Sequence, residues 1–349
     1  MAKLVFITQQ VDPGHPALAA TVPKLRALAE LVDEVVVLAD GAVDGVLPPN
    51  CRVHTFRARH RVGRGVRFEA ALTQELRGLR GGAVVAHMCP IYAVLAAPFV
   101  RPLRIPLVLW FTHWRASRLL QAAERASTAV TSVDTRSFPL RSRKLRAIGH
   151  GIDVSEFPCS PARDGEGLRL LALGRYSPAK GLGVVLRAVA DAGADVRLDV
   201  FGPSLSEEER AHRAELERLA ADLGLEGRVA LGDAVPRAEI PDLLATHDAL
   251  VNNMRAGAPD KVVYEAAAGC LPVLASNPVF DSLLDEEQRF SREDAVALSS
   301  RIRELAQMSQ ADRAEIGRRL RQRVEAGHSV QSWARGILDA AGVTEFGSG

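Results

Sequence analysis

Short apolar runs alternate with longer helical patterns along almost the whole chain, and this alternation constrains the fold more than any other feature. The runs lie at 3–8, 33–39, 83–88, 106–111, 129–133, 168–174, 195–202, 228–232, 248–253 and 271–276. Continuous apolar strands separated by helices are typical of parallel sheets that helices cover on both faces. The alternation therefore predicts an α/β protein.

A turn-rich, polar segment at 148–167 interrupts the alternation, which then restarts. A chain of 349 residues is also long for one domain. We therefore expect two domains, at 1–155 and 156–325, each with its own parallel sheet. The charged, helical residues 326–349 are expected to form a C-terminal helix that packs back toward the first domain, with Trp333 as its apolar anchor.

Composition argues against several other classes of protein. The formal net charge is only +2, so no nucleic-acid partner is expected. No window holds the roughly 18 uncharged apolar residues of a membrane span, and no basic-then-apolar leader opens the chain. The four cysteines, Cys51, Cys89, Cys159 and Cys270, share no CxxC spacing, which favours reduced thiols over a disulfide framework or a zinc site. We expect a soluble, cytoplasmic protein.

Ligands of open α/β sheets bind at the carboxyl ends of the strands, so residues that directly follow strands are the candidates. The stretch GRYSPAKG (174–181) follows one predicted strand and supplies Gly174, Arg175 and Lys180 before a helix. Arginine can bind phosphate oxygens in a fork, lysine adds a point charge, and amides at the helix start add partial positive charge. The stretch suits a diphosphate; a surface turn with two solvated cations is the alternative.

The stretch APDKVVYEAAAGCLPV (258–273) holds a carboxylate, Glu265, inside an apolar helix. Asp260 is expected to cap that helix by accepting from its first amides, but Glu265 lies too deep to do so. A buried carboxylate costs several kcal/mol unless it is hydrogen-bonded. A ribose diol could satisfy it, at roughly 1.5 to 3 kcal/mol per hydrogen bond; an arginine of the same domain could do so equally well.

Lysine is rare in this chain, with five residues among 44 basic ones. Two of the five, Lys180 and Lys261, lie in these two candidate stretches. The coincidence favours a functional role for both, with Lys261 at the mouth of the helix beside the phosphates.

The order of motifs in the second half resembles a known family. GRYSPAKG, a strand ending in VFG, RVALGDAVPRAEIPDLLATHDALVNN and APDKVVYEAAAGCLPVLAS together resemble the nucleotide-sugar domain of retaining glycosyltransferases of family 4, and GHGIDVSEF (149–157) resembles its end-of-first-domain motif. The similarity covers most of 145–280, and the first half matches in layout only. It implies a GT-B fold, in which two Rossmann-like domains face a cleft, and a cytoplasmic bacterial hexosyltransferase of class EC 2.4.

The resemblance also implies roles for individual residues. Arg175 and Lys180 would hold the donor diphosphate, Glu265 would take the ribose hydroxyls, and His113 would lie at the reacting sugar, so His113, Arg175 and Lys180 are the expected catalytic residues. The other expected donor-binding positions are Gly14 in a closing loop, Gly174, Gly202, Val235 in the stretch from Asp233 that borders the base, Asp260 and Lys261. His87, where an acceptor could bind, and His150, by the hinge, rank lower.

No cofactor and no metal are implied: the donor is a nucleoside-diphosphate sugar, with UDP or GDP as the expected nucleotide, and the chain lacks a D-x-D triplet. One departure is clear. The family often has a second glutamate eight positions before the first, and Gly257 stands there. Its contact with the donor sugar passes to the backbone amides of 257–261, to Lys261, or to nothing.

The acceptor is not specified beyond a small molecule, a glycan or a lipid-linked group. The stretch 56–68 is rich in arginine, with Arg57, Arg59, Arg61, Arg64 and Arg67. It is either a solvated loop or a surface for a phosphorylated or lipid-linked acceptor, or for an anionic membrane at the inner face of the cell.

Two other functions stay open on the same layout. An epimerase of nucleotide sugars would need more carboxylates at the strand ends of the first domain. A binding homologue without turnover fits the missing glutamate. A redox dinucleotide protein is disfavoured, because no G-x-G-x-x-G follows the first strand.

Overall fold

The computed structural model describes residues 2–15, 18–79, 81–160, 163 and 165–343. Contacts divide the chain into two compact units: unit 1 holds the residues up to Asp153 and from Gly327 on, and unit 2 is Val154–Ala326. The sequence had placed these boundaries after residues 155 and 325. Parts of the turn-rich segment 148–167 and of the expected C-terminal segment 326–349 lie outside the described residues.

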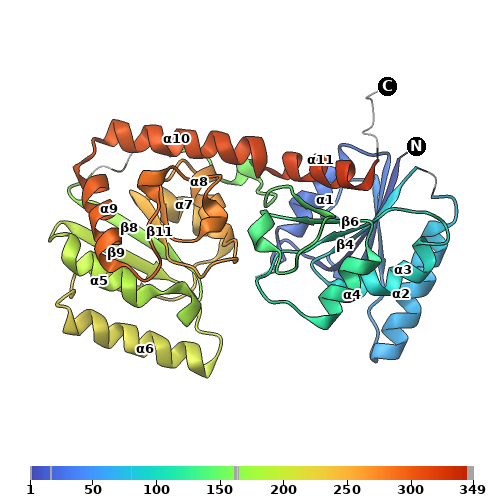
Figure 1. The fold of residues 1–349 in the computed structure, drawn as a ribbon, viewed down its shortest axis with the longest axis horizontal. Helices are drawn as coiled ribbons and strands as arrows, with labels where there is room; N and C mark the ends of the chain where they lie inside the picture. The colour runs from blue at the N-terminus through green and yellow to red at the C-terminus, as the bar shows by residue number, and fades with distance from the viewer. Residues whose placement is uncertain (1, 16–17, 80, 161–162, 164, 344–349) are drawn as a thin grey trace. The chain divides into compact units, whose positions relative to one another are not determined.

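Unit 1 is built on a seven-stranded sheet in the order β3-β2-β1-β4-β5-β6-β7, with every pairing parallel. Its strands are β1 (Lys3–Val11), β2 (Glu34–Ala42), β3 (Cys51–Thr55), β4 (Ala83–His87), β5 (Leu107–Trp110), β6 (Ala129–Ser132) and β7 (Leu145–Ala147). Its helices are α1 (Thr21–Ala29), α2 (Arg61–Leu76), α3 (Pro90–Val100), α4 (Arg118–Ala126) and α11 (Val330–Ala341). Helices α1 and α11 cover one face of the sheet, and α2, α3 and α4 cover the other (Figure 1).

The C-terminal helix α11 contributes to the core of unit 1 through Trp333, which is fully buried. The indole ring packs edge-on against Trp110 of β5 and Phe6 of β1, at centroid distances of 5.7 and 6.4 Å. The Lys24 ammonium lies over Trp110 and Trp333, 4.9 and 5.0 Å from their ring centroids. A cation over a buried aromatic face is attracted by the ring quadrupole, so Lys24 ties α1 to α11.

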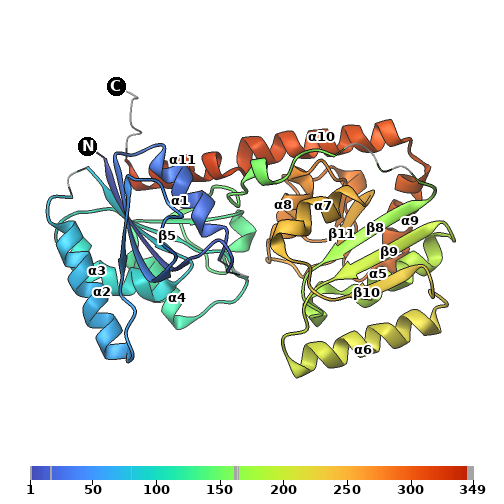
Figure 2. The same cartoon turned by 180° about the vertical axis from the view of Figure 1, so that it is seen from behind.

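Unit 2 is built on a five-stranded parallel sheet in the order β10-β9-β8-β11-β12. Its strands are β8 (Leu168–Leu173), β9 (Val196–Phe201), β10 (Val229–Gly232), β11 (Ala249–Asn252) and β12 (Val273–Ala275). Its helices are α5 (Leu182–Ala192), α6 (Glu207–Asp222), α7 (Ile240–Ala245), α8 (Lys261–Ala268), α9 (Ala295–Gln307) and α10 (Gln310–Gly327). Figures 1 and 2 show α5 and α6 on one face of the sheet and α7 and α8 on the other.

All ten runs that the sequence predicted as strands are strands, and the α/β class is confirmed. Two strands, β3 and β7, were missed. Both lie at an edge of the unit 1 sheet, where one side of the strand meets no further strand. Their sequences, CRVHT and LRA, are short and carry partly exposed polar side chains, so neither shows the continuous apolar run of a central strand.

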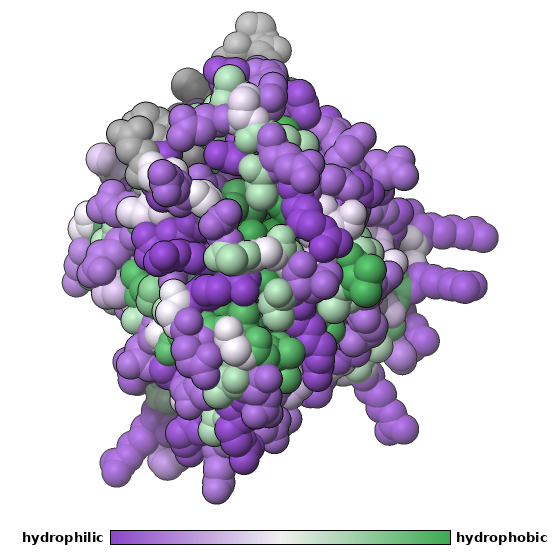
Figure 3. All heavy atoms as spheres, turned by 90° about the vertical axis from the view of Figure 1, so that its left-hand side faces the viewer, coloured by the Kyte–Doolittle hydropathy of each residue, from purple (hydrophilic) through white to green (hydrophobic). Residues whose placement is uncertain are grey.

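The face in Figure 3 is mostly hydrophilic, and its hydrophobic side chains form small patches that polar ones separate. Within the described part of the chain, no helix has the length and apolar content that a membrane crossing requires.

The stability of unit 1 is expected to depend on pH through His328. Burial lowers the pKa of His328 to about 4 from an ordinary 6.5. Between these values the unfolded chain binds more protons than the folded one, so stability falls as the pH is lowered. We expect His328 to make unfolding about 2 kcal/mol easier at pH 5 than at pH 7.

Urea titrations at both pH values measure this effect, and tryptophan fluorescence reports on unit 1 because Trp110, Trp114 and Trp333 all lie there. The variant His328→Gln is the control and should show a correspondingly smaller difference between the two pH values. If the difference in unfolding free energy between the two pH values is the same in His328→Gln as in the wild type, His328 is not its cause.

Candidate functional site

The carboxyl ends of β8 and β11 form the candidate site of unit 2. These two strands are neighbours in the sheet, and β9 and β12 continue it on either side. The chain leaves β8 toward α5 on one face and leaves β11 toward α8 on the other (Figure 2). The helices that follow β8 and β11 therefore lie on opposite faces of the sheet, which makes the edge between these strands a topological switch point. Open α/β sheets bind ligands at such a switch point.

The loop after β8 places Lys180 against the end of that strand. Lys180 Nζ donates to the carbonyl oxygen of Leu173, the last residue of β8, at 2.8 Å. Gly174 makes this approach possible: its φ is +125°, and a Cβ there would lie 2.2 Å from Lys180 Nζ. No side chain of the described residues caps α5, which begins two residues after Lys180, so its first amides can face an anion.

Lys180 also connects the two sides of the switch point. Its ammonium forms an ion pair with Asp260, and Asn252 at the end of β11 donates to the same Asp260 oxygen at 2.7 Å. The expectation that Asp260 caps α8 is wrong, because its side chain makes no capping hydrogen bond. The carboxylate holds Lys180 instead, and only 12% of the lysine side chain is exposed.

Glu265 is buried in α8 and is already neutralised by two cations. Its Oε1 lies 2.7 Å from Arg237 Nη1 and 2.9 Å from Lys261 Nζ, and 4% of the side chain is exposed. The structure thus has the intradomain arginine that the sequence left open as an alternative to a ribose. Burial of Glu265 by itself no longer requires a ligand.

Arg237 is the site residue that sequence reasoning missed. Its Nη2 donates to Glu156 Oε2 at 2.6 Å, so one guanidinium joins Glu265 to Glu156 in the short helix Val154–Glu156. Burial acts to lower the pKa of Arg237, but attraction to Glu265 and Glu156 outweighs it and the net pKa is raised. The only signal in the sequence was that Arg237 lies in the stretch after β10. In a chain with so many arginines, this position alone does not distinguish Arg237 from the others.

The other predicted residues of unit 2 lie in loops after the strands and have separate partners. The Arg175 side chain is 58% exposed and pairs with Glu209 of α6 at 3.1 Å. A Cβ on Gly202, which follows β9, would lie 2.0 Å from the carbonyl oxygen of Gly174, so glycine is required where the two loops meet. Val235 is half-buried in the loop after β10.

At the position of the missing glutamate, the backbone amide of Gly257 donates to Asn277 Oδ1 at 3.3 Å. This amide is therefore engaged within the unit. Of the replacements considered from the sequence, Lys261 lies beside Glu265, with its Nζ 2.9 Å from Glu265 Oε1.

The predicted residues of unit 1 form no such cluster. Gly14 lies in the turn after β1, where its amide donates to Asp12 Oδ1 at 2.8 Å. His113 follows β5, is exposed, stacks on Trp114 and accepts from the amide of Arg115 at 3.0 Å. Partial burial and the nearby Arg115 lower its pKa, which keeps the ring neutral near pH 7.

His87 does not line a surface where an acceptor could bind. The residue is 4% exposed, and its Nδ1 lies 3.3 Å from Thr8 Oγ1 inside unit 1. Burial, together with the charge of Lys24, holds the pKa of His87 well below its ordinary value. His87 is therefore a neutral core residue.

The arginine-rich stretch begins α2 and remains exposed over most of its length. Arg64 lies 3.5 Å from Asp40, and Arg67 donates to the carbonyl oxygen of Arg57 at 2.6 Å. Val62 and Val66 on the same turns are 80% and 61% exposed. The exposed cations and valines fit either interpretation, and contact with an anionic membrane stays a prediction that salt-dependent co-sedimentation with acidic vesicles would test.

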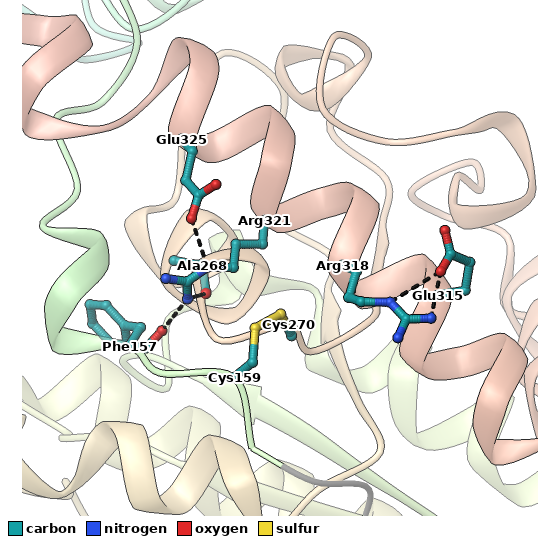
Figure 4. Close-up of a disulfide and its surroundings, with 8 residues drawn as sticks. All are labelled: Phe157, Cys159, Ala268, Cys270, Glu315, Arg318, Arg321 and Glu325. Atoms are coloured by element: carbon teal, nitrogen blue, oxygen red, sulfur yellow. Dashed lines mark hydrogen bonds and ion pairs between the residues drawn. A yellow bond between two sulfur atoms is a disulfide. The ribbon is translucent and has the colours of Figure 1, made fainter.

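The expectation of four reduced cysteines is wrong. Cys159 and Cys270 form a disulfide in unit 2, with their Cα atoms 5.0 Å apart and a sequence separation of 111 (Figure 4). Cys51 and Cys89 are free thiols, and burial raises the pKa of each to about 11. Among the described residues, no group of three or more His, Cys, Asp or Glu side chains is placed to hold a metal ion.

Comparison with solved structures identifies the fold as GT-B. The Anabaena protein HepE in complex with UDP and glucose superposes with a TM-score of 0.74 at 19% identity, over 97% of this chain and 99% of that one. Sucrose-phosphate synthase from Thermosynechococcus elongatus gives a TM-score of 0.70 at 16% identity, over 97% and 98% of the two chains. The chain is thus a GT-B protein with two Rossmann-like domains.

The sequence comparison concerns unit 2. Residues 154–323 match the family described as glycosyl transferases group 1, and this match covers nearly all of the unit and the whole candidate site. A further solved structure, described as trehalose-6-phosphate from E. coli bound with UDP-2-fluoro glucose, has a TM-score of 0.69 at 11% identity over 98% of this chain and all of that one. No curated protein matches the sequence.

Proposed function

We propose that the protein is a retaining, metal-independent glycosyltransferase that moves a hexose from a nucleoside-diphosphate sugar to an acceptor hydroxyl. One observation carries the proposal: within the segment that matches the family, a lysine ammonium and a buried carboxylate lie on the two sides of the switch point. A nucleoside diphosphate needs both kinds of group, a cation for its phosphates and an acceptor for its ribose.

UDP is the proposed nucleotide, with GDP as the alternative. HepE and the E. coli protein are described with UDP or a UDP sugar bound, and their fold is shared over nearly the whole of this chain. The proposed position of the diphosphate is between Lys180 and the first amides of α5, where the cation and the helix dipole act on the same anion. Arg175 would join it by exchanging Glu209 for a phosphate oxygen.

The ribose is proposed to bind the second oxygen of Glu265. Arg237 and Lys261 both approach Oε1, and no described residue donates a hydrogen bond to Oε2. A carboxylate can accept at both oxygens, so a ribose hydroxyl can bind Oε2 while the two cations remain in place. The cations would then orient Glu265 for the ribose.

This arrangement predicts that Glu265 discriminates ribose from deoxyribose. We expect UDP to raise the melting temperature of the protein by mass action and to bind about tenfold more tightly than 2′-deoxy-UDP, because one charge-assisted hydrogen bond is lost. In Glu265→Gln that ratio should fall toward one. Isothermal titration of both nucleotides against both proteins measures it.

Glu226→Gln, which makes the same change at an exposed position after α6, is the matched control and should keep the tenfold ratio. An unaltered ratio in Glu265→Gln would show that Glu265 serves only Arg237 and Lys261. If no nucleoside diphosphate shifts the melting temperature, the proposal of a nucleotide site is wrong.

The proposed chemistry is positional and electrostatic. With retention, the acceptor hydroxyl attacks from the side that the nucleotide leaves, and the leaving diphosphate helps to take its proton. Lys180 would offset the negative charge that grows on that diphosphate, and preorganised charges of this kind are most effective where water is excluded. His113 is proposed to act at the reacting sugar in its neutral form.

The alternatives differ in their products. A transferase releases UDP from a UDP-sugar, slowly to water and faster with acceptor. An epimerase changes the sugar without releasing nucleotide, and a binding homologue does neither. Chromatography of UDP-glucose after incubation with the protein separates the three outcomes.

A further inference from the structure

A cavity opens beside the Cys159–Cys270 disulfide on a part of unit 2 that the candidate site does not use. Its volume is about 290 Å³, and both cysteines line it. The remaining lining comes from Ser160 and Arg163, from α7 and the residues 247–248 that follow it, from the turn between α8 and β12, and from α10. Such a volume admits a small molecule next to the sulfur atoms.

The lining has an excess of positive charge. Arg163, Arg313 and Arg318 contribute three guanidinium groups, against one carboxylate, Asp248, which pairs with Arg163 at 2.9 Å. Arg313 donates to two backbone carbonyl oxygens, at 3.0 and 3.2 Å, and no carboxylate of the described residues forms an ion pair with it. Burial lowers the pKa of His247, which also lines the cavity, so this ring adds no positive charge near pH 7. The guanidinium groups of the lining favour an anion as the ligand.

Arg318 is the cation of the three that can change partner most easily. Its side chain is 61% exposed and forms an ion pair with Glu315, one turn earlier on α10 (Figure 4). An exposed ion pair of this kind contributes little to stability. The guanidinium can therefore exchange Glu315 for an anionic ligand at small cost.

The two cysteines differ in access. Cys159 is an exposed residue, whereas Cys270 is half-buried in the turn after α8. Helix α10 closes over that turn: a Cβ on Gly317 would lie 1.8 Å from the carbonyl oxygen of Cys270. A reagent that enters from solvent is therefore expected to attack the sulfur of Cys159.

We propose that Cys159–Cys270 is a thiol–disulfide exchange site whose reductant is a small thiol bearing carboxylates. The ligand thiolate attacks Sγ of Cys159, forms a mixed disulfide there and releases Cys270 as a thiolate that takes up a proton. A second ligand thiol then attacks the ligand sulfur of that mixed disulfide and frees Cys159. The protein disulfide gains two electrons and two protons, and two ligand thiols become one ligand disulfide.

A second contact favours re-formation of the disulfide, because it holds the two segments together. Arg321 of α10 donates to the carbonyl oxygens of Phe157 and Ala268, at 2.7 and 2.5 Å (Figure 4). These residues lie two positions before Cys159 and Cys270 respectively. After reduction Arg321 still joins the two segments, so the thiols stay close enough to be oxidised again.

The test compares thiols of opposite charge on the full-length, oxidised protein. Glutathione, which is anionic, and cysteamine, which is cationic, reduce the native disulfide and the same disulfide in urea-unfolded protein, which corrects for intrinsic reactivity. We expect glutathione to be favoured in the native state by about threefold to tenfold at low salt, with the preference lost at high salt. Mass spectrometry after acid trapping should place the mixed disulfide on Cys159.

Two arginine variants locate the effect. Arg318→Gln should lower the preference for glutathione, and Arg187→Gln, which removes the same charge from an exposed position on α5, should leave it unchanged. Equal native and unfolded preferences, or trapping on Cys270, would overturn the proposal. So would four free thiols in protein purified without reductant.

Discussion

Replacing Cys159 with serine is expected to lower the free energy of unfolding of unit 2 by about 4 kcal/mol. The disulfide joins residues 111 positions apart and so closes a loop that spans most of the unit. A cross-link over a loop of that length removes much of the conformational entropy of the unfolded chain, which the chain-entropy treatment puts at about 4 to 5 kcal/mol. Arg321 remains in the variant, so the native contacts between the segments are kept.

The three tryptophans permit a clean measurement because all of them lie in unit 1. In urea titrations followed by far-UV circular dichroism, Cys159→Ser should show a lower free energy of unfolding than the wild type. Tryptophan fluorescence in the same titrations monitors unit 1 as an internal reference. Cys51→Ser makes the same change at a free thiol and controls for the substitution. Reductant should reproduce the loss in the wild type and add nothing in Cys159→Ser; equal circular dichroism midpoints for wild type and variant would contradict the prediction.

Lys180→Ala is expected to lower turnover far more than nucleotide affinity. If the ammonium acts on charge that develops as the diphosphate leaves, its removal should reduce kcat by about 100-fold to 1,000-fold, whereas UDP should bind less than about tenfold more weakly. The rate of UDP release from UDP-glucose gives the first quantity and calorimetry gives the second. Equal losses in both would mean that Lys180 only binds the nucleotide.

Asp260→Asn is the matched variant for that experiment. It removes the partner of Lys180 but keeps the ammonium and the contact with Leu173. We expect UDP to bind at least as tightly as in the wild type, since the phosphate no longer competes with a carboxylate. A loss of turnover as large as in Lys180→Ala would indicate that the ion pair, and not the charge, is what matters.

The central strands could be predicted because burial on both faces leaves a continuous apolar run in the sequence. The edge strands β3 and β7 could not, since one side of an edge strand needs no partner and polar residues such as Arg52 are tolerated there. The candidate residues that follow β8 and β11 could also be predicted, because topology alone brings the carboxyl ends of adjacent parallel strands together.

The partners within the site could not be predicted. Nothing in the sequence distinguishes Arg237 from other arginines as the cation on Glu265, or tells that Asp260 faces Lys180 and not the amides of α8. The pairing of Cys159 with Cys270 depends on how α10 and the turn after α8 pack, and spacing gives no sign of it. Long-range contacts of this kind depend on the packing of the whole unit.

The rarity of lysine was a useful signal, but a broader one than expected. Lys3 pairs with the buried Glu75 at 2.7 Å, Lys24 lies over two tryptophans, and Lys144 donates to two backbone carbonyl oxygens at 2.9 and 3.0 Å. Like Lys180, each is a compact cation fitted into its surroundings. Lysine in this chain therefore marks positions where a point charge meets specific partners, whether or not a ligand is involved.

Trp333 belongs to the core of unit 1 but lies near the C-terminal end of the sequence. The two units therefore differ in the stage of synthesis at which they can complete their folding. Every strand and nearly every helix residue of unit 2 has been synthesised before α11 is made, and domains generally fold as they emerge. The first half of the polypeptide must therefore wait, with Phe6 and Trp110 uncovered, while the later half folds. Messages that end early would yield a sound second unit attached to a first one that lacks its closing helix.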